Sequence, residues 1–198
     1  MAVDAQTVKE LRRVSGAGMM ECKKALDETG GDLDTALKYL REQGVKVAAK
    51  KASRQANEGL VYSYIHGPGK LGVLVEVNCE TDFVARTETF QEFCKLVAMH
   101  IAAEAPEFVS RDQVPEVRVA EEKEVLLKQL EDSGKPVNIR EKIVEGRLDK
   151  FYSEICLLDQ EWIHDAEIGT VSDALTAVIA KVGEKTVVNR FARFQIGG

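Results

Sequence analysis

Two short β-type segments joined by a glycine-rich turn constrain the fold of this chain more than any other feature. Residues 60–65 and 71–77 are rich in β-branched and aromatic side chains, and residues 66–70 between them contain Gly-Pro-Gly. In the second segment, valine occupies every other position from 73 to 77. Because alternate residues of a strand share one face, the pattern predicts a β-hairpin in which Val73, Val75 and Val77 lie on one face of the second strand, and Leu74 and Glu76 on the other.

Helical periodicity precedes the hairpin. Glycine-containing breaks divide the first 44 residues into three short helices, of which the second covers residues 19–29. Asp32 is the expected N-cap of the third helix, and Gly44 is expected to end it. Three helices of this length form a compact bundle with a small core. The predicted core positions of the first two helices are Val8, Leu11, Val14, Met20, Ala25 and Leu26.

Longer helices are predicted after the hairpin, with a turn at 133–136 and Ser172 as the N-cap of the last helix. Residues 185–196 alternate and are β-prone, so we expect a final strand that joins the hairpin. The expected fold is α+β: an N-terminal three-helix bundle, then a core with a small antiparallel sheet covered by helices. The predicted later helices cover residues 87–105, 120–132, 139–158 and 173–182.

Charge differs along the chain, which indicates two parts with different surfaces. Residues 1–54 carry 11 of the 27 basic and 8 of the 33 acidic side chains, a net charge of +3, whereas the remainder carries −9. We therefore expect the bundle and a basic linker over residues 1–54, and the α+β core over residues 55–198. The linker, from residue 45 to residue 58, is expected to be partly helical.

Sequence patterns for catalysis are weak. Residues 67–72 form a literal G-x-G-x-x-G, but it opens a strand, whereas a dinucleotide site needs this motif at the start of a helix. His66, His100 and His164 are far apart in sequence and have no metal-site spacing, so we expect ordinary surface or edge histidines. The sequence therefore predicts a non-enzymatic protein without a cofactor or a metal site.

Composition bounds the surroundings of the chain. Cys22, Cys79, Cys94 and Cys156 form no C-x-x-C pair, and we expect free thiols in a reducing compartment. The N-terminus does not resemble a secretory signal, and no apolar stretch is long enough to span a membrane, so a cytoplasmic location without a membrane partner is expected. The formal net charge of −6 argues against direct nucleic-acid binding.

A methionine pair is the first segment that suits a protein contact. Met19 and Met20 are adjacent at the start of a helix, so both side chains cannot point into the core. A flexible thioether at the surface suits binding to another protein. Packing of both methionines at the edge of the bundle is an equal alternative.

The second such segment is Thr81-Asp82-Phe83-Val84, which follows a predicted strand and precedes a long helix. Loops held between rigid elements tend to carry function. The residues alone leave an alternative open, in which Asp82 caps a helix and Phe83 staples that helix to the sheet.

Long motifs around these two segments resemble a known family. Residues 11–26, LRRVSGAGMMECKKAL, resemble the N-terminal signature of bacterial translation elongation factor Ts, and residues 76–86, EVNCETDFVAR, resemble its second signature. Residues 151–160 and 189–194 are also similar to family segments. The resemblance covers essentially the whole chain, and the two long motifs occur in the expected order.

The resemblance implies a guanine-nucleotide exchange factor for elongation factor Tu. In that family, a ubiquitin-associated-type bundle docks on the GTPase domain of the partner. An Asp and a Phe then wedge between partner helices and disturb the Mg²⁺ site, so that GDP leaves. Here Asp82 and Phe83 match those residues, flanked by Thr81 and Val84, and the methionine pair is the expected docking contact of the bundle.

Chain length adds an expectation about assembly. Long members of the family carry a duplicated core and an inserted helical hairpin, and 198 residues are too few for both. The chain resembles the short form, which implies a homodimer formed through the core around the sheet.

Two other functional classes are kept as rival hypotheses: an adaptor that binds ubiquitin-like proteins through its bundle, and a cytosolic enzyme.

Overall fold

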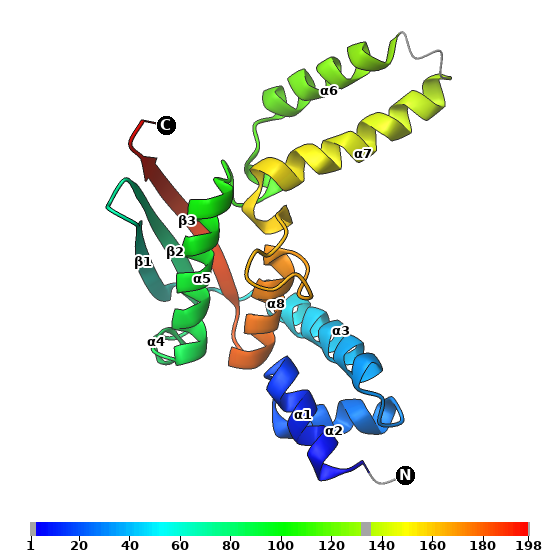
Figure 1. Ribbon diagram of the computed structural model, residues 1–198, viewed down its shortest axis with the longest axis vertical. Helices are drawn as coiled ribbons and strands as arrows, with labels where there is room; N and C mark the ends of the chain where they lie inside the picture. The colour runs from blue at the N-terminus through cyan, green and yellow to red at the C-terminus, as the bar shows by residue number, and fades with distance from the viewer. Residues whose placement is uncertain (1–2, 132–135, 198) are drawn as a thin grey trace. The chain divides into compact units, whose positions relative to one another are not determined.

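The structure is a computed structural model that describes residues 3–131 and 136–197 (Figure 1). Its fold is α+β, as predicted. Strands β1 (Glu58–His66), β2 (Leu71–Cys79) and β3 (Thr186–Gln195) form a three-stranded antiparallel sheet in the order β1-β2-β3. The chain divides into two compact units. The first contains residues 3–62, 76–95 and 173–188, and the second contains residues 63–75, 96–131, 136–172 and 189–197.

The first unit begins with the three predicted helices, α1 (Ala5–Ser15), α2 (Met19–Glu28) and α3 (Leu33–Lys51). Two expected core positions are wrong, because Val14 is 52% exposed and Met20 is 75% exposed. Each three-residue step rotates the side-chain direction by about 60° around an α-helix. Val14, two such steps after Val8, has therefore turned away from the core. The buried core of this bundle consists of Val8, Leu11, Cys22, Ala25, Leu26 and Ala36.

Two helix starts test the predicted caps. The backbone N–H of Thr35 donates to Asp32 Oδ1 at 2.8 Å, which confirms Asp32 as the N-cap of α3. The Ser172 prediction is wrong, because α8 (Val171–Val182) begins two residues before the predicted start at residue 173 and includes Ser172. Gly183 ends α8 as predicted, and its φ of 72° is the left-handed conformation that glycine adopts without strain.

Gly44 does not end α3, contrary to the prediction. It lies buried inside the helix, and a Cβ added there would lie 3.6 Å from side-chain atoms of Thr176 and Ala180 in α8. The glycine therefore marks a close contact between two helices of the first unit. Residues 45–51 of the expected linker continue the helix to Lys51.

The hairpin forms as predicted, and the valine face of its second strand is buried. Val73, Val75 and Val77 are buried, while Leu74 on the opposite face is exposed. After β2 the chain forms the one-turn helix α4 (Asp82–Ala85) and then α5 (Glu88–Glu104), which confirms the long helix predicted at 87–105. The apolar stripe of α5 is buried at Phe90, Phe93, Val97 and Ile101, with Cys94 beside it.

The second unit contains a pair of helices, α6 (Glu116–Glu131) and α7 (Val137–Ile155), that lie side by side (Figure 1). α6 begins four residues before its predicted start, and residues 133–135 of the predicted turn lie outside the described residues. The short 3-10 helices η1 (Arg111–Gln113) and η2 (Leu157–Asp159) flank the pair. The two helices pack on each other through Leu126, Leu130 and Val144.

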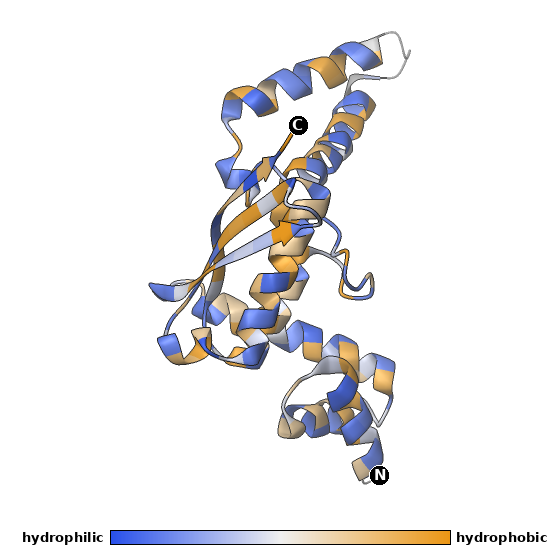
Figure 2. Cartoon of the chain, turned by 60° about the vertical axis from the view of Figure 1, so that its left-hand side comes forward, coloured by the Kyte–Doolittle hydropathy of each residue, from blue (hydrophilic) through white to orange (hydrophobic). Residues whose placement is uncertain are grey.

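Hydropathy follows this architecture. Figure 2 shows hydrophobic and hydrophilic positions alternating along the helices, as expected where each helix buries one face.

In the second unit, the guanidinium of Arg193 on β3 donates to the Ala102 carbonyl of α5, at 3.2 and 3.3 Å from its two nitrogens. Within residues 3–131 and 136–197, no helix has the length and apolar character needed to cross a membrane.

Candidate partner-binding site

The segment Thr81–Val84 forms the start of the one-turn helix α4, directly after β2. Thr81 is the N-cap, because its Oγ1 accepts a hydrogen bond from the Val84 N–H at 3.4 Å. The alternative in which Asp82 caps the helix is therefore wrong. Asp82 is the first residue of the turn, and its carboxylate lies where the backbone N–H groups of a helix start favour negative charge.

The side chains of α4 divide into an outward and an inward set. Phe83 is 79% exposed, so it does not staple the turn to the sheet. Val84 and Ala85 are buried and anchor the turn from the inside. Because a large apolar side chain gains free energy by leaving water, an aromatic ring held outward on an anchored turn is a group that a partner can bury. Of the four predicted site residues, Phe83 is thus the apolar group presented to solvent.

Asp82 is partly exposed and has a partner within the same segment. Arg86 Nη2 lies 2.8 Å from Asp82 Oδ2, an ion pair with the i, i+4 spacing of one helical turn. Both side chains are largely in water, where such a pair contributes well under 1 kcal/mol. The Asp82 carboxylate can therefore exchange this partner for another one at small cost. The spacing of the two residues was visible in the sequence, but Arg86 was not singled out.

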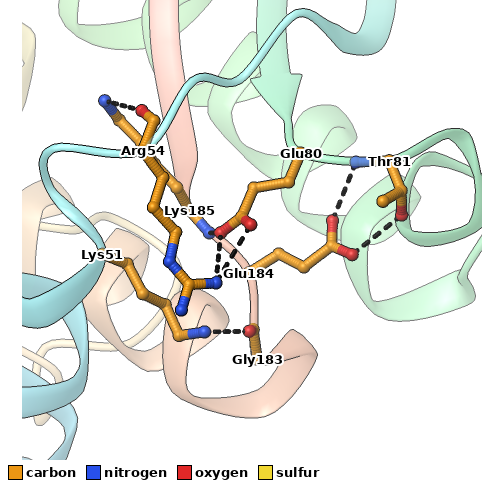
Figure 3. A network of polar contacts seen from close by, with 7 residues as sticks. All are labelled: Lys51, Arg54, Glu80, Thr81, Gly183, Glu184 and Lys185. Atoms are coloured by element: carbon orange, nitrogen blue, oxygen red, sulfur yellow. Dashed lines mark hydrogen bonds and ion pairs between the residues drawn. The ribbon is translucent and has the colours of Figure 1, made fainter.

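A carboxylate from the other end of the chain holds Thr81 in place (Figure 3). Glu184, in the turn between α8 and β3, accepts the Thr81 backbone N–H on Oε2 at 3.0 Å and the Thr81 hydroxyl on Oε1 at 2.8 Å. The two residues are 103 positions apart. No local pattern in the sequence indicates this contact, and sequence reasoning missed Glu184.

Glu80 makes a matching contact in the opposite direction (Figure 3). Its Oε1 accepts the backbone N–H of Lys185 at 2.6 Å, and its Oε2 lies 3.1 Å from Arg54 Nη1. The Lys185 hydrogen bond is the largest of the effects that hold the pKa of Glu80 below its ordinary value, and the Arg54 side chain lowers it further. The Glu80 carboxylate is therefore stabilised in its charged form.

Two lysines connect this network to the end of α3. Lys185 Nζ donates to the carbonyls of Ala52 and Arg54 at 2.7 and 2.8 Å, and Lys51 Nζ donates to the Gly183 carbonyl. Part of the predicted basic linker thus serves to attach α3 to the α8–β3 turn (Figure 3). All these residues belong to the first unit.

The methionine pair lies in the first turn of α2. Met19 is 41% exposed and Met20 is 75% exposed, so neither is part of the bundle core. The turn itself is fixed, since the Gly18 N–H donates to Glu21 Oε2 at 3.1 Å. The bundle therefore presents two flexible apolar side chains from a helix start of fixed geometry.

The histidine and cysteine side chains with catalytic potential include Cys79 beside the site, whose thiol donates to the Thr81 carbonyl at 3.1 Å. His100 is buried, which corrects the expectation of a surface or edge histidine: Nε2 lies 3.0 Å from Gln160 Oε1, and the ring stacks on Trp162. Burial lowers the pKa of His100. Cys22, Cys79, Cys94 and Cys156 are free and buried. In the part of the chain that the structure describes, no group of acidic, histidine or cysteine side chains is arranged to hold a metal ion.

Comparisons with known proteins agree over almost the whole chain. Residues 5–197 match the family model described as "Elongation factor TS". Elongation factor Ts of Caldanaerobacter subterraneus subsp. tengcongensis is 57% identical over 195 residues, which cover 98% of this chain and 97% of that protein. Elongation factor Ts of Geobacter sulfurreducens is 53% identical over 197 residues, covering 100% of this chain and 91% of the relative.

Proposed function

Because this chain belongs to the elongation factor Ts family, we propose that it is a guanine-nucleotide exchange factor that binds GDP-loaded elongation factor Tu and promotes GDP release during translation elongation. The observation that carries the proposal is the outward position of Phe83, 79% exposed on a turn anchored by buried Val84. A side chain in this position is available to a partner without any unfolding of α4.

Asp82 and Phe83 act together in the proposed mechanism. Phe83 inserts between helices of the partner's GTPase domain, and Asp82 approaches the same region. The displaced partner elements include those that hold Mg²⁺. Because Mg²⁺ bridges protein oxygens and nucleotide phosphates and neutralises their charge, its loss weakens GDP binding. The weak ion pair between Asp82 and Arg86 lets the carboxylate move to a new partner.

The N-terminal bundle supplies affinity in this proposal. Met19 and Met20 are exposed in the first turn of α2 and dock on the GTPase domain. Methionine adapts its shape to an irregular apolar surface, which suits a contact that must form and break in each round of exchange. The bundle binds, and the α4 turn triggers release.

A homodimer is the proposed assembly. In the second unit, Leu74, Ile65 and Phe194 are exposed apolar side chains of the sheet. A Cβ on Gly72, which shares the face of Leu74, would lie 3.1 Å from Ile65 Cδ1, so Ile65 also lies on the face opposite the buried valines. A second copy of the chain that covers this face would remove these side chains from water.

Nucleotide release from the partner tests the proposal. Elongation factor Tu loaded with a fluorescent GDP is mixed with excess unlabelled GDP, with and without this chain. Acceleration of release that saturates with chain concentration is expected. An unchanged release rate would refute the exchange function and leave the ubiquitin-like adaptor as the next hypothesis. In that case, deletion of residues 1–54 would abolish binding to a ubiquitin-like protein.

A further inference from the structure

The Glu184 carboxylate, which lies outside α4, accepts two hydrogen bonds from Thr81, the residue that caps this turn. We infer that Glu184 is a positioning residue for exchange: by binding both donors of Thr81, it fixes the α4 turn and so the direction in which Phe83 projects. This inference rests on the proposed function. Figure 3 shows the Glu184 carboxylate in contact with Thr81, the N-cap of α4. Glu184 therefore acts on Phe83 through Thr81.

The geometry of the contact leaves Thr81 little freedom. One oxygen of Glu184 binds the backbone N–H, and the other binds the side-chain hydroxyl, so the residue is held at two points. Hydrogen bonds to a charged acceptor are shorter and stronger than those between neutral groups. The same hydroxyl oxygen accepts the Val84 N–H at 3.4 Å. An unbroken chain of contacts therefore leads from Glu184 through Thr81 into the first turn of α4.

Glu184 is itself held from both sides. The N–H of Gly183 donates to the Ile179 carbonyl at 3.0 Å, and Lys51 binds the Gly183 carbonyl. On the other side, the N–H of Lys185 donates to Glu80 at 2.6 Å. Glu80 directly precedes Thr81, as Glu184 directly precedes Lys185. The two pairs bind each other reciprocally, because each pair supplies one carboxylate that accepts and one backbone N–H that donates. Such reciprocal contacts resist both translation and rotation of the turn.

A four-residue helix needs this external support. α4 covers only Asp82–Ala85, and one turn of helix fixes several backbone angles for very few internal hydrogen bonds. Without Glu184, Val84 and Ala85 would still anchor the turn, but Thr81 would lose two of its contacts and move more freely, so that partner binding would carry the cost of ordering it. The expected result is slower exchange with an intact fold, because the buried residues of α4 and α5 are unchanged.

Four single variants and the double variant of Thr81→Val with Glu184→Ala test the inference. Glu184→Ala removes both acceptors, and Thr81→Val removes only the hydroxyl contacts. Glu184→Gln is the rescue variant: its amide oxygen can accept the Thr81 N–H while its amide nitrogen donates to the Thr81 hydroxyl. Glu92→Ala is the matched control, because it deletes a carboxylate of the first unit that forms an ion pair with Lys95 on the surface.

Three measurements are made on each variant: the maximal rate of GDP release from elongation factor Tu, the chain concentration that gives half of it, and hydrogen exchange of the Thr81 amide in the chain alone. For Glu184→Ala we expect about a tenfold loss in the maximal release rate divided by the chain concentration that gives half of it. This change corresponds to 1.4 kcal/mol at 25 °C. Faster exchange of the Thr81 amide is expected with it. Glu184→Gln should recover most of the activity, and Glu92→Ala should match the wild type.

The outcomes separate the inference from the proposed function. If the wild-type chain does not accelerate GDP release, the proposed function falls, and the inference falls with it. If the wild type accelerates release and Glu184→Ala does so equally, only the inference falls. If Glu184→Ala does not fold, Thr81→Val decides: an exchange rate equal to that of the wild type overturns the inference. Additive losses from Thr81→Val and Glu184→Ala in the double variant would also overturn it, because residues that act through one contact are not additive.

Discussion

Replacement of Phe83 by alanine should separate partner binding from folding. Phe83 is 79% exposed, whereas Phe90, at the start of α5 in the same unit, is fully buried. Removal of a buried phenylalanine ring costs about 3–5 kcal/mol of the free energy of unfolding. Because only about a fifth of Phe83 is buried, its replacement should cost on the order of 1 kcal/mol or less. Phe90→Ala should cost the full amount.

The effect on exchange should be large. Full burial of a phenylalanine side chain contributes about 1.5–3 kcal/mol. If the exposed four-fifths of Phe83 becomes buried in the partner, Phe83→Ala loses about 1–2.5 kcal/mol, or on the order of 5- to 60-fold in the rate of GDP release at low chain concentration. A wedge loses most of this in the maximal release rate, whereas a plain anchor, which contributes equally before and during release, loses it in affinity with the maximal rate unchanged.

Two assays check this prediction: denaturant unfolding of each variant alone, and fluorescent GDP release from elongation factor Tu with each variant. The reasoning is refuted if Phe83→Ala destabilises the chain as much as Phe90→Ala does. It is also refuted if Phe83→Ala folds normally and releases GDP at the wild-type rate.

Three further predictions follow from other parts of the molecule. Burial raises the pKa of the Cys94 thiol to about 12, so a coloured disulfide reagent at pH 8 should label it only after unfolding; rapid labelling of the native chain would contradict this. Burial lowers the pKa of His100, so its contribution to stability is complete above the unfolded value of about 6.5 and is lost as the pH falls through the folded value. Denaturant unfolding between pH 7 and pH 5 should therefore show a decrease that His100→Gln reduces, and an unchanged slope in that variant would argue against the assignment. Light scattering at micromolar concentration should give a mass twice 21.9 kDa for the wild type and a monomer for Leu74→Glu; a monomeric wild type would exclude the homodimer.

Local patterns predicted the elements of the fold well, because the forces that set them act between near neighbours. The alternation of Val73, Val75 and Val77 placed these residues on one face of β2, which is the buried face, and Asp32 identified the start of α3. Helix boundaries were predicted less well: α6 begins four residues and α8 two residues before the predicted starts, and α3 does not end at Gly44. Gly44 was read as a helix end, but it is small because α8 packs against it, and nothing in the neighbouring sequence reveals that contact.

The candidate site could likewise be predicted from the sequence only in part. The segment Thr81–Val84 was found from its position between a strand and a helix and from its resemblance to a family motif. Its supports could not be found, because Glu184 contacts Thr81 across 103 positions and Lys185 contacts Ala52 across 133. Exposure of Phe83 also required the structure, since the sequence was equally compatible with a ring stapled to the sheet.

Nucleotide and exchange factor must weaken each other's binding to the same partner, because their effects on each other's affinity are equal by linkage. Calorimetric titration of this chain into nucleotide-free elongation factor Tu, and into the same protein saturated with GDP and Mg²⁺, measures this coupling directly. The expected result is a dissociation constant about 5- to 150-fold higher or more in the presence of GDP. Equal dissociation constants in the two titrations would contradict the proposal that this chain promotes GDP release.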